Sequence, residues 1–403
     1  MLGESKKRLE LVLKAGSFVF ALIIAAKILN FIKKILIGNL FGISWQADSF
    51  FAASYLPYYM AVFFEGLIYL GFIPLFSKVL AEEGMEEAKN RIGDILPWII
   101  LVAAILVFGA CWGAPWLIRE IAPGFKPEAQ LLTESLFRIV SLVIIFITLS
   151  SFFQSLNSFF GNYVAAASSG LTDSVVMIVL TIALSPAGGI YAAAWGAVAG
   201  AFTSFAYELF LLNRSQKILP LKIRVNRRSF FWFLNMLVPL GIIWVFQMGP
   251  IFILNRFGSG MWQGTISAMT IALGIMVVPT GLVSQTILIS IFPFLAKEAH
   301  DTETNNVQET FFQTLRAAFF ILIPVGFLLS GLSRPIALLF FGHDGEVTEG
   351  VRRISNSLFY LGWSAFVFYA DLFMTQSLIT IRKIPPAILL CITRAAITYG
   401  FCY

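Results

Sequence analysis

The sequence is poor in the residues that enzymes and metal sites need. Its 403 residues include three cysteines and two histidines, which do not have the spacing of a metal site or a disulfide framework. It also lacks a glycine-rich phosphate loop and a nucleophile accompanied by a base. We therefore expect a protein that is not an enzyme and that uses neither a cofactor nor a bound metal.

Charge is also scarce. Charged residues make up 12% of the chain, about half the share in a soluble domain, whereas hydrophobic residues make up 58%. A run of about 20 apolar residues spans a bilayer, and several charge-free stretches exceed that length. These stretches are 95–118, 139–172, 174–207, 229–255 and 257–296. The sequence thus predicts an all-α polytopic membrane protein, and its net charge of +6, distributed over short loops, does not suggest a nucleic-acid partner.

The hydrophobic pattern predicts about eleven transmembrane helices. Basic residues gather in the N-terminal segment and in the loops after the even-numbered helices, most densely at 214–228. Because positively charged loops stay in the cytoplasm, this distribution predicts a cytoplasmic N-terminus. The predicted helices cover residues 15–39, 47–78, 93–117, 131–158, 162–185, 188–213, 229–256, 262–294, 312–341, 352–380 and 384–403.

Two stretches of the chain resemble each other, Phe41–Lys78 and Phe257–Lys297. Both begin with Phe-Gly, continue with Trp-Gln and a small residue, and end in a proline-containing segment closed by lysine. In a membrane chain, such a repeat is typical of a duplicated transporter lobe. We predict an N-terminal lobe over 1–213 (helices one to six), a basic cytoplasmic linker over 214–228, and an incomplete C-terminal lobe over 229–403 (helices seven to eleven).

The candidate functional residues are charges inside predicted spans. Helix one carries Lys27, Lys33 and Lys34, of which the first and last share a face. A charge at bilayer depth costs on the order of 3 kcal/mol, so such residues usually face a bundle interior or a wet cavity, the alternative being snorkelling to an interface.

Asp48 could be the first-turn carboxylate of helix two or the counter-charge of Lys33 or Lys34. Glu65 lies mid-span, and Lys27 is its best candidate partner, in a structural ion pair or a substrate site. Charged residues near predicted span ends are interpreted as interfacial anchors: Asp173, Glu208, Arg316, Arg334 and Asp371.

Prolines and glycines inside the predicted helices are candidates for hinges. Kinked or interrupted helices commonly flank the cavity of an alternating-access carrier. The predicted gating or hinge residues are Pro57, Gly66, Pro74, Pro279 and Gly281.

The first two helices carry motifs of a known family. The sequence resembles the lipid II flippases, the MurJ/MviN family of the MOP transporter superfamily, and the likeness continues over 228–247 and Pro279–Pro293. The two arginines of the family's first helix are Lys27 and Lys33 here, which keep the charge but lose the bidentate fork suited to pyrophosphate. The residues that carry the resemblance are Ala26–Lys34, Gly38, Phe41-Gly42, Asp48-Ser49-Phe50, Leu56-Pro57, Glu65-Gly66 and Phe72-Ile73-Pro74.

The resemblance implies a fold and a function. The fold is two pseudo-symmetric six-helix lobes in a MATE-like inverted V, with a cavity lined by helices one, two, seven and eight. The family has fourteen helices, so we expect this chain to be C-terminally truncated. The implied activity is moving an undecaprenyl-pyrophosphate-linked glycan (lipid II) to the outer leaflet of the bacterial cytoplasmic membrane. Lys27, Lys33 and Lys34 would hold the pyrophosphate, and Asp48 and Glu65 would pair with them. The implied partners are this glycan, membrane lipid and cell-wall synthesis proteins.

Two other functions stay open on the sequence. The first is a related carrier, either an exporter of another lipid-linked oligosaccharide or a MATE-type cation antiporter. An antiporter needs a buried acid for its coupling ion, and Glu65 is the deepest candidate. The second is a non-transporting membrane protein of envelope assembly, which would bind a partner protein but no lipid headgroup.

Overall fold

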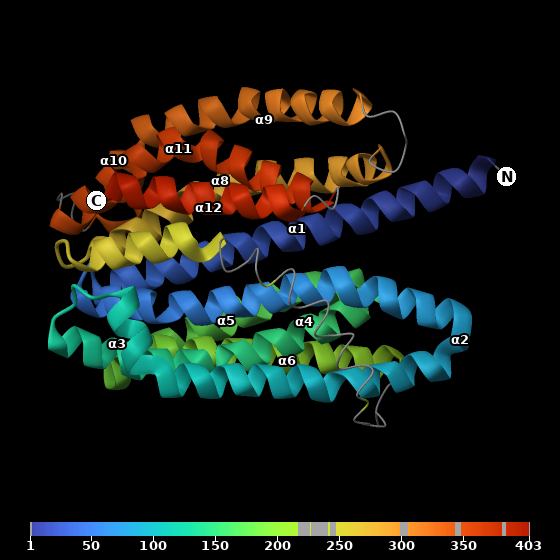
Figure 1. Ribbon diagram of the computed structural model, residues 1–403, viewed down its shortest axis with the longest axis horizontal. Helices are drawn as coiled ribbons and strands as arrows, with labels where there is room; N and C mark the ends of the chain where they lie inside the picture. Colours follow the sequence, from blue (N-terminus) through green and yellow to red (C-terminus); the bar gives the residue numbers. More distant parts are fainter. Residues whose placement is uncertain are drawn as a thin grey trace. The chain divides into compact units, whose positions relative to one another are not determined.

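The described part of the chain is built from α-helices (Figure 1). The computed structural model describes residues 2–216, 226, 241, 247–298, 305–342, 348–380 and 384–402, without the side chains of 2–17, 69–75, 78, 284–298, 305–308, 380 and 384. The helices are α1 Leu2–Phe41, α2 Trp45–Ile121, α3 Pro127–Ser141, α4 Val143–Phe159, α5 Tyr163–Gly188, α6 Tyr191–Gln216, α8 Thr265–Glu298, α9 Asn305–Gly331, α10 Ser333–Phe341, α11 Glu349–Thr380 and α12 Ile384–Cys402. Residues 247–259 are also helical.

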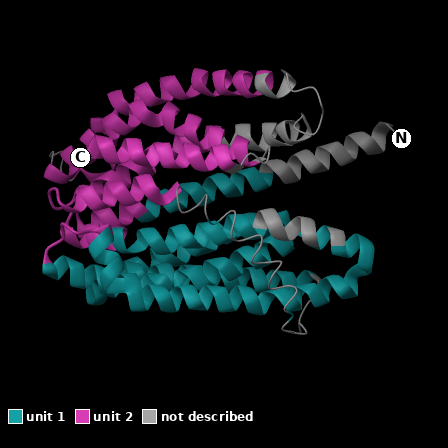
Figure 2. Cartoon of the chain, in the orientation of Figure 1, with its two compact units in different colours: residues 1–33, 52–120, 127–241 teal, residues 34–51, 121–126, 242–403 magenta. Residues whose placement is uncertain are grey.

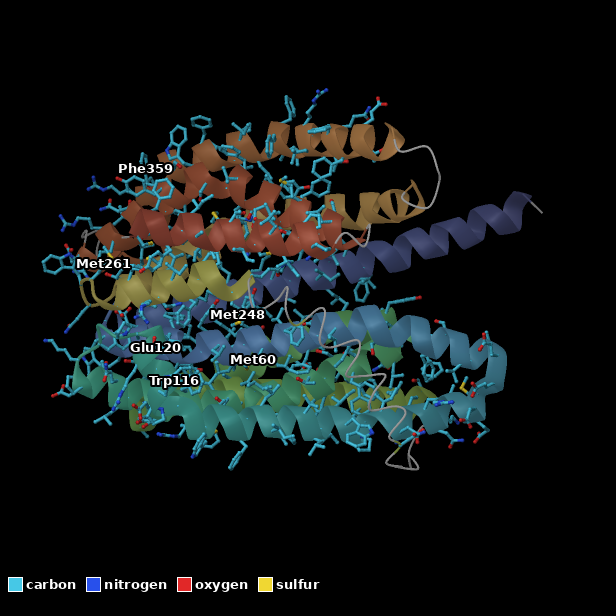
Figure 3. All side chains as sticks on the ribbon, in the orientation of Figure 1. Met60, Trp116, Glu120, Met248, Met261 and Phe359 are labelled. Atoms are coloured by element: carbon cyan, nitrogen blue, oxygen red, sulfur yellow. The ribbon has the colours of Figure 1, made fainter. Side chains whose placement is uncertain are left out.

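The helices are suited to a lipid environment. Within the described ranges, nine stretches are long and apolar enough to cross a membrane. Large apolar side chains are exposed along them: Trp116 on α2, labelled in Figure 3, is 67% exposed, and Phe320 on α9 is 83% exposed. Such surfaces are costly in water but are expected where a helix faces hydrocarbon. The prediction of an all-α polytopic membrane protein is confirmed.

Helix α2 consists of two helices joined at a break. The helical conformation is interrupted at Gly84 (φ 84°, ψ 179°), which lies between predicted helices two and three. The helices on either side of Gly84 extend further than predicted and take in most of the segment expected to be a basic loop. Arg91 in this segment lies 3.7 Å from carboxylate oxygens of both Glu83 and Glu87, and its pair with Glu87, four positions away, stabilises the second helix modestly. The break between predicted helices two and three is therefore confirmed, whereas the expected length of the loop was wrong.

Two predicted helices are divided, and two predicted segments lie mostly outside the described residues. The predicted helix 131–158 consists of α3 and α4, which meet at Leu142, and the predicted helix 312–341 consists of α9 and α10, which meet at Leu332. The linker 214–228 and the predicted helix 229–256 are described only in part.

The described residues form two compact units (Figure 2). Unit 1 contains residues 1–33, 52–120 and 127–241, and unit 2 contains 34–51, 121–126 and 242–403. The division falls inside α1, between Lys33 and Lys34, and inside α2, between Phe51 and Ala52. Each unit has a core of its own. Buried core residues of unit 1 include Phe76, Ile92, Phe152, Leu156 and Leu212, and those of unit 2 include Ala318, Leu322, Tyr369 and Phe373.

Close helix packing in unit 1 depends on small residues. On α6, Gly196 and Gly200 form a Gly-x-x-x-Gly pair against α5. A Cβ atom at Gly200 would lie 2.5 Å from the carbonyl oxygen of Asp173, and one at Gly196 would lie 2.9 Å from Oγ1 of Thr181. Helices in a membrane associate through such close backbone approaches, because moving an apolar side chain from lipid into a helix interface gains little hydrophobic free energy. The pair therefore fixes α6 directly over Asp173.

The sequence repeat is not matched residue for residue in the local structure. In the first copy the helix begins at Trp45, whereas in the second copy Trp262 lies in a turn and the helix begins at Thr265. The glycine with a positive φ angle also occupies a different position in each copy: it is Gly42 (φ 70°) in the first copy and Gly264 (φ 89°) in the second. The duplication itself stays a prediction.

Candidate functional site

Lys33 is held in an ion pair inside unit 1. Its Nζ atom donates a hydrogen bond of 2.7 Å to Oδ2 of Asp173 on α5, and the two side chains are only 8% and 18% exposed. The interpretation of Asp173 as an interfacial anchor was wrong, because the residue lies in the interior of α5 and pairs with Lys33. Of the two alternatives for Asp48, the counter-charge of Lys33 is thus wrong, because Lys33 pairs with Asp173.

Four helices of unit 1 meet around Asp173. Tyr58 on α2 interacts electrostatically with this carboxylate, and Gly200 on α6 packs against it. Oδ1 of Asp173 is buried and has no hydrogen-bond partner among the described residues. On α1, one turn and a half before Lys33, Lys27 attracts Glu65 of α2 electrostatically. The predicted partnership of Lys27 with Glu65 is confirmed, so two lysines of α1 each have a counter-carboxylate within unit 1.

Asp48 belongs to unit 2 and binds the start of another helix. The residue lies in the first turn of α2, as predicted, but its Oδ2 accepts a 2.6 Å hydrogen bond from the Gly264 N–H and its Oδ1 accepts a 2.7 Å bond from the Ser267 N–H. The first N–H groups of a helix have no partner within it and carry the positive end of its dipole. Asp48 therefore acts as the N-terminal cap of α8, from 216 residues away.

The other predicted site residues lie within helices. Lys34 is half-buried and belongs to unit 2. Helix α2 runs through Pro57 and Pro74, and α8 runs through Pro279 and Gly281, so these helices do not end there. The remaining predicted hinge residue, Gly66, lies in the interior of α2. The binding and gating roles of all these residues stay predictions.

Unit 2 contains a second intramembrane ion pair. Arg394 on α12 binds Asp371 on α11 through Nη1, and its Nη2 donates a 3.2 Å hydrogen bond to the carbonyl oxygen of Gln247. The guanidinium thus joins α11, α12 and the helical residues 247–259. Asp371 is a partner within the bundle, so its interpretation as an interfacial anchor was wrong.

A pocket of about 570 Å³ also lies in unit 2, where α11 begins. Glu349 pairs there with Arg352 at 3.0 Å and with Arg353 at 3.2 Å, so one carboxylate partly neutralises two cations. None of the predicted site residues lines it. The lining residues are Trp262, Thr265, Ala268, Glu349, Arg352, Arg353, Asn356 and Ser357.

Sequence reasoning missed Asp173, Arg394 and a buried carboxyl on α6, Glu208. Asp173 separates two charge-free runs, 139–172 and 174–207, and lies inside the predicted helix 162–185, yet it was interpreted as an interfacial anchor. A charge that interrupts such a long apolar stretch is itself a signal, because an intramembrane charge needs a partner. Lys33 of α1 was the available opposite charge.

Charged pairs buried in a multi-pass helical bundle define a class, the membrane transporters with polar sites inside the bilayer. Solved structures share the fold. A lipid II flippase MurJ in an inward closed conformation matches with a TM-score of 0.72 and 20% identity, covering 95% of this chain and 86% of that one. An inward-facing multidrug resistance MATE transporter of the MOP superfamily matches with a TM-score of 0.74 and 16% identity, covering 92% and 84%.

The family follows from the sequence comparison. The family model described as lipid II flippase MurJ matches residues 37–372, and the chain belongs to that family. A relative from Buchnera aphidicola, named a probable lipid II flippase MurJ, is 24% identical over 342 residues, which are 80% of this chain and 64% of the relative. The chain thus spans slightly less than two thirds of that relative's length. The resemblance found in the first two helices is confirmed.

Proposed function

We propose that this protein moves an undecaprenyl-pyrophosphate-linked glycan, lipid II or a close relative, from the inner to the outer leaflet of a bacterial cytoplasmic membrane by alternating access. The observation that carries the proposal is the match to the lipid II flippase family over residues 37–372. The intramembrane lysines of α1 supply the cations that a pyrophosphate group requires. The basic residues in the N-terminal segment and in the loops after the even-numbered predicted helices favour a cytoplasmic N-terminus.

The ion pairs suggest how the site handles an anion. Asp173 neutralises Lys33, and Glu65 attracts Lys27. An unpaired buried cation would cost several kcal/mol, so the carboxylates stabilise the two lysines. A pyrophosphate that approaches Lys33 replaces Asp173 as its partner, and the released carboxylate then favours a different local arrangement. A charge that has one partner in one conformation and another partner in a second conformation makes different contacts in the two. Such a difference can shift the equilibrium between the conformations.

Lysine suits this exchange better than arginine. Arginine binds a carboxylate through a rigid two-pronged fork, whereas lysine acts as a point charge on a flexible stem. A lysine can turn from Asp173 to a phosphate oxygen without a matched pair of acceptors. We therefore expect the lysines to bind pyrophosphate electrostatically, but to distinguish it from other anions by geometry less well than arginines would.

The antiporter alternative has less support. Glu65 was its candidate acid, and Lys27 already supplies a counter-charge for that carboxylate. An exporter of another lipid-linked oligosaccharide would use the same lysines, and the glycan alone would distinguish it. Cell-wall synthesis proteins are proposed partners on the ground of the family alone.

The experiment is translocation in proteoliposomes that contain a lipid-linked glycan in one leaflet. Appearance of the glycan in the other leaflet is followed with an enzyme that modifies only exposed glycan. We expect translocation by the wild-type protein and at least about tenfold slower translocation by the Lys27→Ala/Lys33→Ala variant, because each lysine contributes an ionic contact worth about 1.5–3 kcal/mol.

The matched control is Lys126→Ala, since Lys126 is an exposed lysine in the turn before α3. This variant should translocate at the wild-type rate. Equal rates in the double variant and the wild type would contradict the proposal for the lysines. Translocation that requires a sodium or proton gradient and disappears in Glu65→Gln would favour the antiporter.

A further inference from the structure

Glu208 on α6 is a fully buried carboxyl whose partners are neutral. Its relative exposure is 0%. Oε2 accepts a 2.6 Å hydrogen bond from Nδ2 of Asn157 on α4, and the same Nδ2 lies 3.0 Å from the backbone carbonyl oxygen of Glu208. Oε1 is buried and has no hydrogen-bond partner in the described structure. The interpretation of Glu208 as an interfacial anchor was wrong, because the carboxyl faces the interior of unit 1.

Several charged groups on the helices of unit 1 are paired with one another. On α2, Arg91 pairs with Glu83 and Glu87. On α3, Arg138 pairs with Glu134, and on α5, Asp173 pairs with Lys33. Tyr207, the neighbour of Glu208 on α6, shares a 2.8 Å hydrogen bond with the Ser168 hydroxyl. Among the described residues, the groups that contact the Glu208 carboxyl are therefore Asn157 and the Ser169 hydroxyl, both uncharged.

An ionised carboxylate in this position would be expensive. Moving an ion out of water costs several kcal/mol even after relaxation, and only a close counter-charge or several hydrogen bonds offset that cost. Asp173 has Lys33, Glu65 has Lys27, Asp371 has Arg394, and Asp48 has two backbone N–H groups of α8. Glu208 has one amide N–H and the Ser169 hydroxyl. A proton removes the charge and lets the carboxyl donate a hydrogen bond as well as accept one.

A short polar route connects the carboxyl with the protein surface. Nδ2 of Asn162, in the turn between α4 and α5, lies 3.4 Å from Oδ1 of Asn157, which in turn binds Glu208. Gly161 in the same turn is exposed. Glu208 is also eight positions from Gln216 at the end of α6, about 12 Å along a helix. Water at this turn is thus separated from the carboxyl by two amide side chains.

We propose that Glu208 is a proton-binding site of unit 1, occupied at neutral pH and exchanging its proton with water that enters from the α4–α5 turn, beside Asn162 and Asn157. In the predicted orientation this turn faces the cytoplasm. The site goes beyond the proposed lipid transport and does not depend on the identity of the lipid.

The proton step is simple. Oε2 stays the acceptor of the Asn157 N–H, and Oε1, which has no hydrogen-bond partner among the described residues, carries the proton. Uptake forms one O–H bond on Oε1 and consumes one hydronium ion, leaving water at the turn. Release breaks that bond and returns the proton to water, so charge and atoms balance without an oxidant or a further reactant.

Infrared spectroscopy of the protein in lipid membranes tests the proposal directly. At neutral pH we expect a carbonyl-stretch band of a protonated carboxyl that shifts in D₂O, is absent in Glu208→Gln, and decreases reversibly at alkaline pH. Glutamine resembles the neutral acid and can still accept from Asn157, so this variant should fold. The control Glu134→Gln, which removes a carboxylate paired with Arg138 at 3.6 Å, should change only carboxylate bands.

A second variant keeps the test decisive if Glu208→Gln does not fold. Asn157→Ala retains the carboxyl but removes its hydrogen-bond donor, so the band must persist at a different frequency. A wild-type spectrum in which Glu208→Gln removes only carboxylate bands would overturn the proposal. So would a difference spectrum that responds to sodium or potassium at constant pH, because the ligand would then be a metal cation. Because the measurement involves no transported lipid, its outcome is separate from that of the translocation assay.

Discussion

The ion pair between Lys33 and Asp173 should be strongly coupled energetically. At 2.7 Å and an effective dielectric constant of about 20, the gross attraction between unit charges is about 6 kcal/mol. Desolvation offsets much of this attraction, but removing one partner of a buried pair leaves the other charge uncompensated and costs about 3–5 kcal/mol. We therefore predict that Lys33→Met and Asp173→Asn each lower the free energy of unfolding by about this amount.

The double variant Lys33→Met/Asp173→Asn distinguishes the interaction energy of the pair from the contacts that each residue makes with its surroundings. With both charges absent, no buried ion is left unpaired, so the double variant should be more stable than the sum of the two losses by about 2–3 kcal/mol. The assay is unfolding of the protein in mixed micelles with increasing denaturing detergent, followed by tryptophan fluorescence. Losses that add within about 0.5 kcal/mol would show that the two charges act independently, which would refute the reasoning.

The same variants distinguish a structural ion pair from a substrate site. If pyrophosphate competes with Asp173 for Lys33, Asp173→Asn should retain a lipid-linked pyrophosphate about tenfold more tightly, a difference of about 1.4 kcal/mol. The Lys33→Met/Asp173→Asn variant should lose that gain. Binding that is unchanged in Asp173→Asn would restrict the pair to a structural role.

Three further predictions concern stability, measured as thermal unfolding in detergent. Asp48→Ala leaves two buried N–H groups at the start of α8 without an acceptor, so we expect a loss of about 2–5 kcal/mol. Gly200→Val places a side chain against the backbone of Asp173, and overpacking of this kind costs about 1–3 kcal/mol. Arg394→Met leaves Asp371 unpaired and should cost about 3–5 kcal/mol, part of which Arg394→Met/Asp371→Leu should restore.

Each of these variants has a control of the same residue type or in the same segment. Gln46→Ala changes an exposed residue in the same turn as Asp48, and Gly113→Ala changes a helical glycine whose added Cβ would meet a neighbouring side chain at an ordinary 3.6 Å. Arg352→Met removes an arginine whose side chain is 66% exposed. All three should stay within about 0.5 kcal/mol of the wild type. A control that falls as far as its partner variant would contradict the cause given for that variant.

The sequence predicted the class of the fold because that class depends on apolar length and charge placement. Charge-free runs identify membrane helices whatever their packing, and the pairing of Lys27 with Glu65 followed because both charges were expected at similar depth. Helix ends were less predictable. The run of charged residues around Gly84 looked like a loop by composition, yet the helical conformation is interrupted only at Gly84, and the ion pair of Arg91 with Glu87 supports the helix that follows.

Partners distant in the sequence could not be predicted in the same way. Asp48 was recognised as a helix-start carboxylate, but its hydrogen bonds go to α8, and nothing in its own neighbourhood indicates Gly264 or Ser267. Asp173 and Glu208 were interpreted as interfacial anchors although each lies inside a predicted helix, 162–185 and 188–213 respectively. Their burial depends on packing between α4, α5 and α6, which hydropathy does not record.

The central claim is that this family member binds a lipid-linked pyrophosphate through the lysines of α1. Native mass spectrometry tests it most directly, with the purified protein offered lipid II, an undecaprenyl-pyrophosphate glycan without peptide, and undecaprenyl phosphate. We predict retention of a pyrophosphate-linked glycan by the wild type and by Lys126→Ala, and loss of that retention in Lys27→Ala/Lys33→Ala. Failure to retain any of the three lipids, or equal retention by the double variant, would contradict the claim.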